Sequence, residues 1–165
     1  NGNFYEIGYS FPLEISERSK TFGRYSRLHF KTGLTLNQYN ATGGNTIDNY
    51  EWNSQYLGLR SDLEYYILGA DLLALSIDGG IGFEFLLNGK QKIGGNTYDL
   101  KDSDEFNGLY FTPRIGLNLS VNITNEVALI GGYNFSKAIS SSKSGNESVS
   151  FNNNQLRFGI IIQTY

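Results

Sequence analysis

Apolar and polar residues alternate along seven segments of the chain. In residues 109–121 the odd positions hold Leu, Phe, Pro, Ile, Leu, Leu and Val, and the even positions hold Tyr, Thr, Arg, Gly, Asn and Ser. Successive side chains of a β-strand point to opposite faces, so this period predicts a strand with one apolar and one polar face. The predicted strands are residues 5–13, 28–36, 57–67, 75–87, 109–121, 127–135 and 156–163.

Short and long connections alternate between these strands, which is typical of an antiparallel up-and-down meander. The short connections are residues 13–24, 68–72 and 122–126. The long ones, residues 40–53, 88–107 and 136–154, contain stretches rich in Asn, Gly, Ser and Asp and are predicted to be loops. We therefore expect three long loops at one end of the sheet.

The alternation does not say whether the apolar face points inward, as in a soluble barrel or sandwich, or outward, as in a membrane barrel. Two features favour outward. The apolar face carries more large side chains than the narrow interior of about eight strands can hold. The polar face carries many glycines, which leave room in a crowded interior and give water little to solvate on an outer surface. These glycines are Gly8, Gly33, Gly58, Gly80, Gly82, Gly116, Gly132 and Gly159.

The polar face also carries acidic and basic residues in balance. Buried charges must be paired, so a balanced set fits a closed polar interior. We predict a network that includes His29 and these charged residues: Glu6, Arg27, Lys31, Arg60, Asp62, Glu64, Asp78, Glu84, Arg114 and Arg157. The alternative is a solvated outer face.

Together these patterns predict an all-β fold: one antiparallel, up-and-down transmembrane β-barrel spanning residues 1–165. Seven strands cannot close an antiparallel barrel, because the two edge strands would run in the same direction. We therefore expect eight strands, seven of them visible in this sequence. The eighth is expected to precede residue 1 or, failing that, to come from a partner chain.

Composition excludes several classes of function. The 165 residues include no cysteine and one histidine, which excludes disulfide scaffolds, thiol nucleophiles and multi-histidine metal sites. The net charge of −3 disfavours a generally basic nucleic-acid-binding protein. No run approaches the roughly 18 apolar residues of a transmembrane helix. We expect no cofactor, no metal and no small-molecule ligand.

Three local features are candidates for chemistry or positioning. His29 could act as a general base, but it lies on the polar face and not toward lipid. Tyrosine and tryptophan at 50, 52, 56, 65 and 66 lie near strand ends, where aromatic girdles of membrane barrels occur. An acidic segment lacks the spacing of a calcium loop and is predicted to be a solvated surface that contacts a partner. Its charged residues are Asp99, Lys101, Asp102, Asp104 and Glu105.

The sequence YLGLRSDLEYY of residues 56–66, GGIG of 79–82, RIGLNL of 114–119 and GGYNF of 131–135 resemble the small outer-membrane β-barrel domains common in Bacteroidota. The resemblance covers nearly the whole chain. It implies an eight-stranded, OmpX-like barrel in the outer membrane of a Gram-negative bacterium, acting as a surface protein or as a subunit of a larger complex. In such barrels the long loops are extracellular and the short turns periplasmic.

We therefore expect an integral, non-enzymatic barrel that contacts outer-membrane lipid and, through its long loops, a protein partner. Three alternatives remain open at this point: a lipid-modifying barrel enzyme, a soluble small-ligand barrel and a narrow pore. An enzyme of the first kind would need a polar catalytic group facing lipid, and none is recognisable in the sequence. The balanced charges of the polar face argue against the pore.

Overall fold

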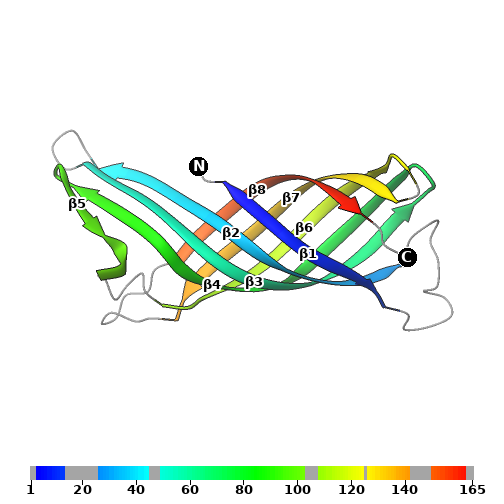
Figure 1. The fold of residues 1–165 in the computed structure, drawn as a ribbon, viewed down its shortest axis with the longest axis horizontal. Coiled ribbons are helices and arrows are strands. Elements are labelled where there is room, and N and C mark those ends of the chain that lie inside the picture. The colour runs from blue at the N-terminus through cyan, green and yellow to red at the C-terminus, as the bar shows by residue number, and fades with distance from the viewer. Residues whose placement is uncertain are drawn as a thin grey trace.

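The computed structural model describes residues 3–13, 26–44, 49–102, 108–124, 126–141 and 150–162. These residues form one antiparallel sheet with the strand order β1-β2-β3-β4-β6-β7-β8, in which the short β5 pairs only with β4 (Figure 1). The elements are β1 (Phe4–Pro12), β2 (Leu28–Gly44), β3 (Asn49–Gly69), β4 (Leu73–Ile93), β5 (Asn96–Asp99), the 3-10 helix η2 (Leu100–Asp102), β6 (Tyr110–Asn122), β7 (Val127–Ser140) and β8 (Ser150–Ile162).

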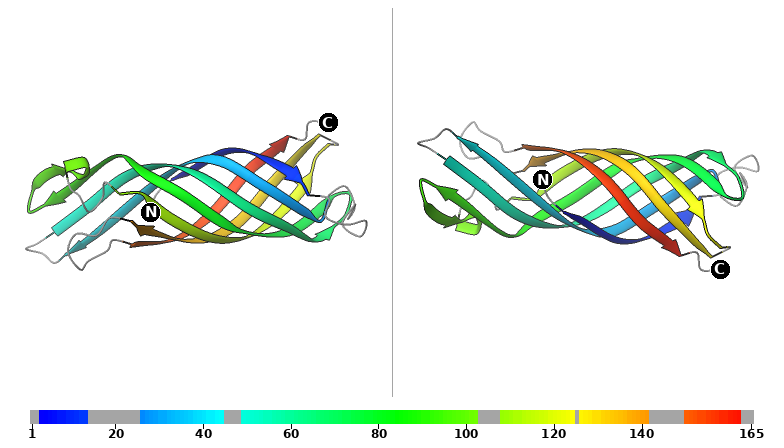
Figure 2. Two further views of the ribbon diagram at one scale, coloured as in Figure 1. Left: turned by 90° about the horizontal axis from the view of Figure 1, so that it is seen from below. Right: turned by 90° about the horizontal axis from the view of Figure 1, so that it is seen from above.

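The sheet is curled, so that its two edge strands, β1 and β8, lie on the same side of the molecule (Figure 2). Each neighbouring pair along the strand order is antiparallel, and β1 and β8 therefore run in the same direction. We call the end with the β3–β4 and β6–β7 connections the turn end. The opposite end, where β4 turns into β5, is the hairpin end.

All seven predicted strands are confirmed, but several of them are longer than predicted. The β2–β3 ladder continues as far as the pair Gly44 and Asn49, inside the predicted loop 40–53. Likewise β4 runs to Ile93 and pairs with β5, inside the predicted loop 88–107. The third predicted loop, 136–154, includes the end of β7 and the start of β8. The loop boundaries were therefore wrong, because ladder hydrogen bonds continue where both faces are polar and alternation is lost.

The β4–β5 connection is a two-residue hairpin turn that requires glycine. Gly94 and Gly95 have φ angles of 54° and 85°. A two-residue turn of this kind places both central residues at positive φ, which glycine adopts without steric cost. The eighth strand of the observed sheet is thus a short extension of the hairpin end, distinct from the expected strand before β1.

The outward direction of the apolar face is confirmed. Large apolar side chains of every long strand are exposed on the outer surface, among them Leu34, Leu59, Phe83, Leu117, Leu129 and Phe158. The alternate positions point to the interior, where Asp62, Glu64, Asp78 and Asn118 are almost completely buried. This distribution is the reverse of that in a soluble globular protein. None of the described residues forms a helix long and apolar enough to cross a membrane.

The aromatic girdle is only partly as expected. Tyr50 and Tyr65 are exposed, but Tyr56 and Tyr66 are buried in the interior. Trp52 is half-buried and packs against the interior cluster around Tyr56. Between residues 52 and 66 the even-numbered positions of β3 face inward, so these three rings follow the strand's period of two and cannot reach the outer surface.

Candidate functional site

The interior contains two connected groups of ion pairs. In the first, Arg60 of β3 contacts two carboxylates: its Nη1 lies 2.5 Å from Oε2 of Glu6 on β1, and its Nε lies 3.0 Å from Oδ2 of Asp62. Arg114 of β6 approaches the other oxygen of Asp62, with 3.6 Å between Nε and Oδ1. These side chains link β1, β3 and β6 across the interior.

The second group is centred on Glu64 and Asp78. Lys31 Nζ lies 2.7 Å from Glu64 Oε1, and the same oxygen accepts a 2.6 Å hydrogen bond from the Ser76 hydroxyl. The Asn118 amide donates to both carboxylates, at 3.2 Å to Glu64 and 2.9 Å to Asp78. Shared donors of this kind lower the cost of burying two acidic side chains in one interior.

Arg157 of β8 joins the two groups. Its Nη2 donates to Asp78 Oδ2 at 3.1 Å and to the Asn118 carbonyl oxygen at 2.5 Å. Its Nη1 lies 3.8 Å from Glu6 Oε2, so this one guanidinium connects the edge strand β8 with the opposite edge strand β1. Eight of the ten predicted charged residues are thereby connected in one network around the curled sheet.

Inward-facing glycines make room for these side chains. A Cβ atom at Gly116 would meet the side chains of both Asn134 and Asp78. At Gly80 it would meet the backbone of Ser61 and the Asp62 carboxylate. A bulky residue at either position would therefore displace part of the network.

An aromatic cluster closes the interior toward the hairpin end. Its buried members are Tyr56, Leu86, Leu100, Tyr110 and Ala138, and Tyr39, Trp52 and Phe151 pack against them. The rings are in direct contact, with centroids 5.0 Å apart for Tyr56 and Tyr110 and 5.2 Å apart for the stacked Tyr39 and Phe151. We call this group the aromatic plug.

Glu84 lies between the network and the plug. Its Oε2 accepts a 2.9 Å hydrogen bond from the Tyr39 hydroxyl. The remaining predicted members, Arg27 and His29, are half-buried near the turn end. Nδ1 of His29 lies 3.0 Å from the Ser10 hydroxyl, and its ring packs edge-on against Tyr66, with the centroids 5.3 Å apart.

The acidic segment at the hairpin end is held in place by an apolar side chain. Asp99, Lys101 and Asp102 are exposed, whereas Leu100 between them is 1% exposed and belongs to the plug. The backbone N–H of Lys101 donates to the Asp99 carboxylate at 2.9 Å, which fixes the turn. Asp104 and Glu105 lie outside the described residues.

The described part of the chain contains no group of three or more His, Asp or Glu side chains that could hold a metal ion. In comparisons with known proteins, no family model matches the chain, and no curated protein or solved structure is significantly similar to it. The resemblance to outer-membrane barrel domains stays a prediction from sequence.

The sequence interpretation missed the aromatic plug. One signal was present: Tyr56, Leu86 and Tyr110 are large side chains at inward positions where most neighbours are small or polar. All three lie toward the hairpin end of the sheet. Leu100 gave no such signal, because it lies in a polar stretch that has no period.

Proposed function

We propose that this chain is an integral outer-membrane β-barrel of a Gram-negative bacterium, without enzymatic activity. Its function would be structural: it anchors a partner-binding surface at the hairpin end. The observation that carries the proposal is the reversed distribution of side chains, with apolar groups exposed around the sheet and ion pairs buried inside it. Lipid is the solvent in which this arrangement is favourable.

The strand lengths are consistent with such an anchor. A membrane-spanning strand needs about 9–11 tilted residues. β1 has 9 residues and β6 has 13, but β3 and β4 each have 21. We call the exposed apolar surface around Leu34, Leu59, Phe83 and Leu117 the apolar belt. The additional residues of β3 and β4 carry β5 and η2 beyond this belt, and Figure 1 shows both at the hairpin end. A rigid platform that presents polar residues is a suitable binding surface.

Flotation with lipid vesicles tests the membrane part of the proposal. The chain is refolded from urea into phosphatidylcholine vesicles, washed with carbonate and centrifuged through a density gradient. We expect it to float with the vesicles and to precipitate when it is refolded without lipid or detergent. A monodisperse, cooperatively folded chain in detergent-free buffer would contradict the proposal and favour the soluble ligand-binding barrel.

Co-purification from detergent-solubilised outer membrane tests the partner-binding part. The Asp99→Asn/Asp102→Asn variant changes only exposed side chains, so the barrel should fold as before and lose its partner. A matched control, Asp71→Asn, changes an exposed carboxylate at the turn end. Unchanged co-purification of the hairpin-end variant would exclude its carboxylates from the binding surface.

Two further measurements separate the remaining alternatives. The buried network and plug occupy the interior, so planar-bilayer recordings should show no stable conductance; a steady open channel would favour the pore. His29 contacts Ser10 on the inward-facing side of the strands, away from lipid, so lipids incubated with the barrel should keep their mass. Lipid cleavage that is abolished by Ser10→Ala would favour the enzyme.

A further inference from the structure

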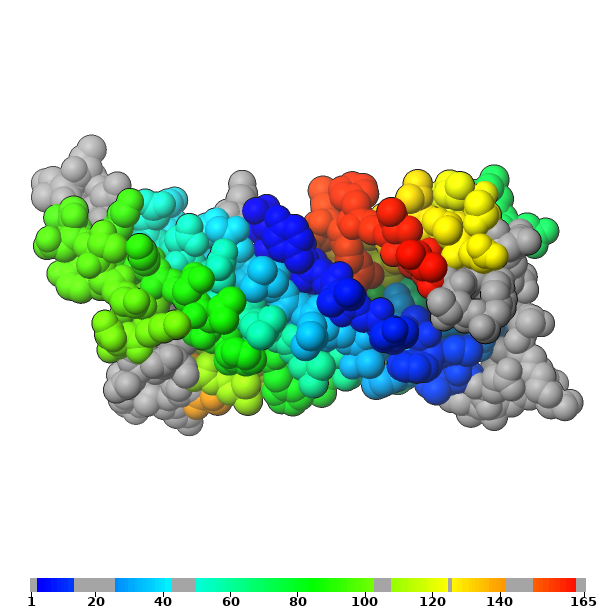
Figure 3. Space-filling model, in the orientation of Figure 1, coloured from blue at the N-terminus to red at the C-terminus, as the bar shows by residue number. Residues whose placement is uncertain are grey.

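Four strands continue beyond the apolar belt and form a smaller sheet at the hairpin end. We call this sheet the flap, and it consists of residues 38–44 of β2, 49–55 of β3, 88–93 of β4 and the whole of β5. Its β4 and β5 part, green in Figure 3, projects from one end of the molecule, away from β1 and β8. The two faces of the flap continue the outer and inner faces of the barrel.

The outward face of the flap is polar. On β3 the outward positions change from Leu57 in the belt to Gln55 and Glu51 in the flap. The Asn88 amide donates to the Gln55 side chain at 3.0 Å, and Lys92 Nζ lies 3.9 Å from Glu51 Oε2. Amides and charges of this kind are costly to place in hydrocarbon, so under the proposed function the flap lies in water.

The inward face of the flap carries aromatic, apolar and neutral polar side chains. Directly paired residues of antiparallel strands point to the same face. The register places two such rows across β3, β4 and β5: Trp52, Gln91 and Tyr98 in the first, and Tyr50, Ile93 and Asn96 in the second, nearer the tip. The Tyr50 and Trp52 rings are in contact, with their centroids 5.2 Å apart. We call these six residues the flap face.

The rings of the flap face are exposed, unlike those of the plug. Tyr98 is 52% exposed and Tyr50 is 38% exposed, whereas Tyr56 of the plug is completely buried. Tyr and Trp combine a large apolar surface with a polar group and are enriched at the centres of binding surfaces. The flap face therefore has the composition of a binding surface, and the chain itself leaves its rings accessible.

The side chains of the flap face are all uncharged. The charged residues of the flap, Glu51, Lys90, Lys92 and Asp99, lie in the intervening rows, which point to the opposite face. An anionic ligand, such as a phosphate or an acidic peptide, would find no cation on the flap face. The ligand that fits exposed rings and amides is uncharged, with an apolar side and a hydrogen-bonding rim.

We propose that the flap face binds a neutral oligosaccharide. A sugar ring presents C–H groups on one side, which stack on an aromatic ring, and hydroxyl groups around its rim, which bond to amides. Trp52 and Tyr98 supply the rings, and Gln91 between them supplies an amide. The two aromatic residues are two strands apart, about 10 Å, which is close to the length of two linked sugar rings. A purely apolar partner would cover the rings but would exclude water from the amides of Gln91 and Asn96.

A ligand of this kind differs from the sequence-based expectation of no small-molecule ligand. The flap face is assembled from three strands, and their register is not visible in the sequence. The inference goes beyond the proposed function, which assigns a protein partner to exposed carboxylates. It rests on that function only for the position of the flap outside the membrane.

Trp52 is the only tryptophan of the chain, so its fluorescence reports on this site. The chain is refolded into lauryldimethylamine oxide micelles, which contain no sugar, and titrated with neutral hexasaccharides of glucose, mannose, galactose and N-acetylglucosamine. We expect a saturable change in Trp52 fluorescence with at least one of them and none with an oligogalacturonate of the same length. A response to none of the neutral hexasaccharides, or an equal response to the oligogalacturonate, would overturn the proposal.

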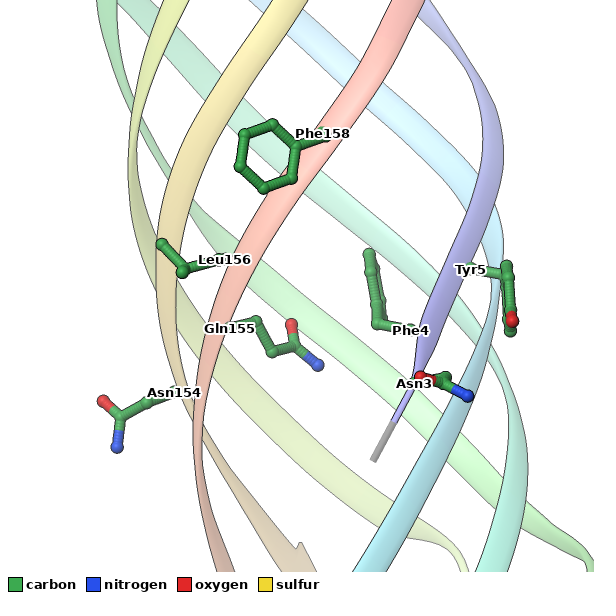
Figure 4. Close-up of a pocket in the computed structure, with 7 residues that line it drawn as sticks. All are labelled: Asn3, Phe4, Tyr5, Asn154, Gln155, Leu156 and Phe158. Carbon is green, nitrogen blue, oxygen red and sulfur yellow. The ribbon is translucent and has the colours of Figure 1, made fainter. Parts of the chain in front are cut away.

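Two variants and a matched control locate the binding. Tyr98→Ala removes an exposed ring of the flap face and should weaken the affinity at least about tenfold. Asn96→Ala removes an amide and should weaken it less. The control, Tyr5→Ala, removes a ring that is 62% exposed on β1, beside the cleft between β1 and β8 (Figure 4), and should leave the affinity unchanged. Unchanged affinity of Tyr98→Ala, or an equal loss in Tyr5→Ala, would contradict the assignment.

The glycan and the protein partner can be tested separately. The Asp99→Asn/Asp102→Asn variant should lose its protein partner and keep its glycan affinity, because Asp99 points away from the flap face. Loss of glycan binding in this variant would place the ligand on the opposite face and overturn the proposal. The titration is made in micelles, so it does not depend on the result of vesicle flotation.

Discussion

The side chains on the outer and inner faces of one strand differ more in chemistry and exposure than the side chains of any two strands do. On β6, Leu117 is 48% exposed and its neighbour Asn118 is 1% exposed, although their backbones belong to one ladder. The outer face is uniform and its side chains are interchangeable apolar groups. The inner face is specific, because each charged group depends on named partners. Substitutions on the two faces should therefore destabilise the protein for different reasons.

The largest loss of stability is expected on the inner face. Arg157→Met leaves Asp78 and Glu6 without one of their cations, and breaking a buried ion pair costs about 3–5 kcal/mol. Urea unfolding in detergent micelles, followed by circular dichroism, measures the change. The double variant Arg157→Met/Asp78→Asn should lose less than the sum of the two single variants. Additive losses would mean that the two residues do not interact.

A charge introduced on the outer face should reduce the free energy of unfolding slightly less than the loss of Arg157 does. In the proposed membrane location, Leu117→Arg would place a guanidinium in hydrocarbon, which costs about 2–4 kcal/mol near the middle of a membrane. The measurement is reversible unfolding from lipid vesicles. Thr97→Arg, in the exposed β5, adds the same charge outside the apolar belt and should have little effect. Equal tolerance of both substitutions would contradict the assignment of this face to lipid.

Two adjacent glycines on β4 compare the faces directly. A Cβ at Gly80 would lie 2.6 Å from Cα of Asp62, so Gly80→Val should destabilise by about 1–3 kcal/mol through overpacking. A Cβ at the exposed Gly79 would approach nothing closer than 3.9 Å, and Gly79→Val should be neutral or slightly stabilising. The urea unfolding midpoints of the two variants test this prediction. A lower midpoint for Gly79→Val than for Gly80→Val would mean that Gly79 faces the interior.

The smallest effect is expected for an ion pair outside the belt. Lys92 and Glu51 lie 3.9 Å apart with more than half of each side chain exposed. Exposed pairs contribute about 0–1 kcal/mol, so Lys92→Ala should barely change the urea midpoint. Lys31→Ala removes the buried partner of Glu64 and should cost several times as much. Similar losses for the two variants would mean that the interior is solvated.

The sequence predicts the strands and the direction of their faces because both depend on local alternation and on the volume of the side chains. Leu117 and Asn118 illustrate this, since their positions follow from a period of two. The extent of the strands could not be predicted at Gly44 and Asn49, where ladder hydrogen bonds hold residues that show no pattern. The complete plug could not be predicted either, because Tyr39 of β2 and Phe151 of β8 stack on each other only once the sheet has curled.

The order of the strands also determines how the sheet can form. Because the long strands pair with their neighbours along the chain, each ladder can form as a hairpin, without bringing distant segments together. Contacts between the two ends of the sheet are different: the hydrogen bond from Gln155 to Asn37 joins residues 118 positions apart. Closing a loop of this length in the unfolded chain has a high entropy cost, and this cost falls once the intervening strands have formed. Curling of the sheet should therefore be the slow, late step of folding, and variants of Gln155 or Arg157 should accelerate unfolding more than they slow folding.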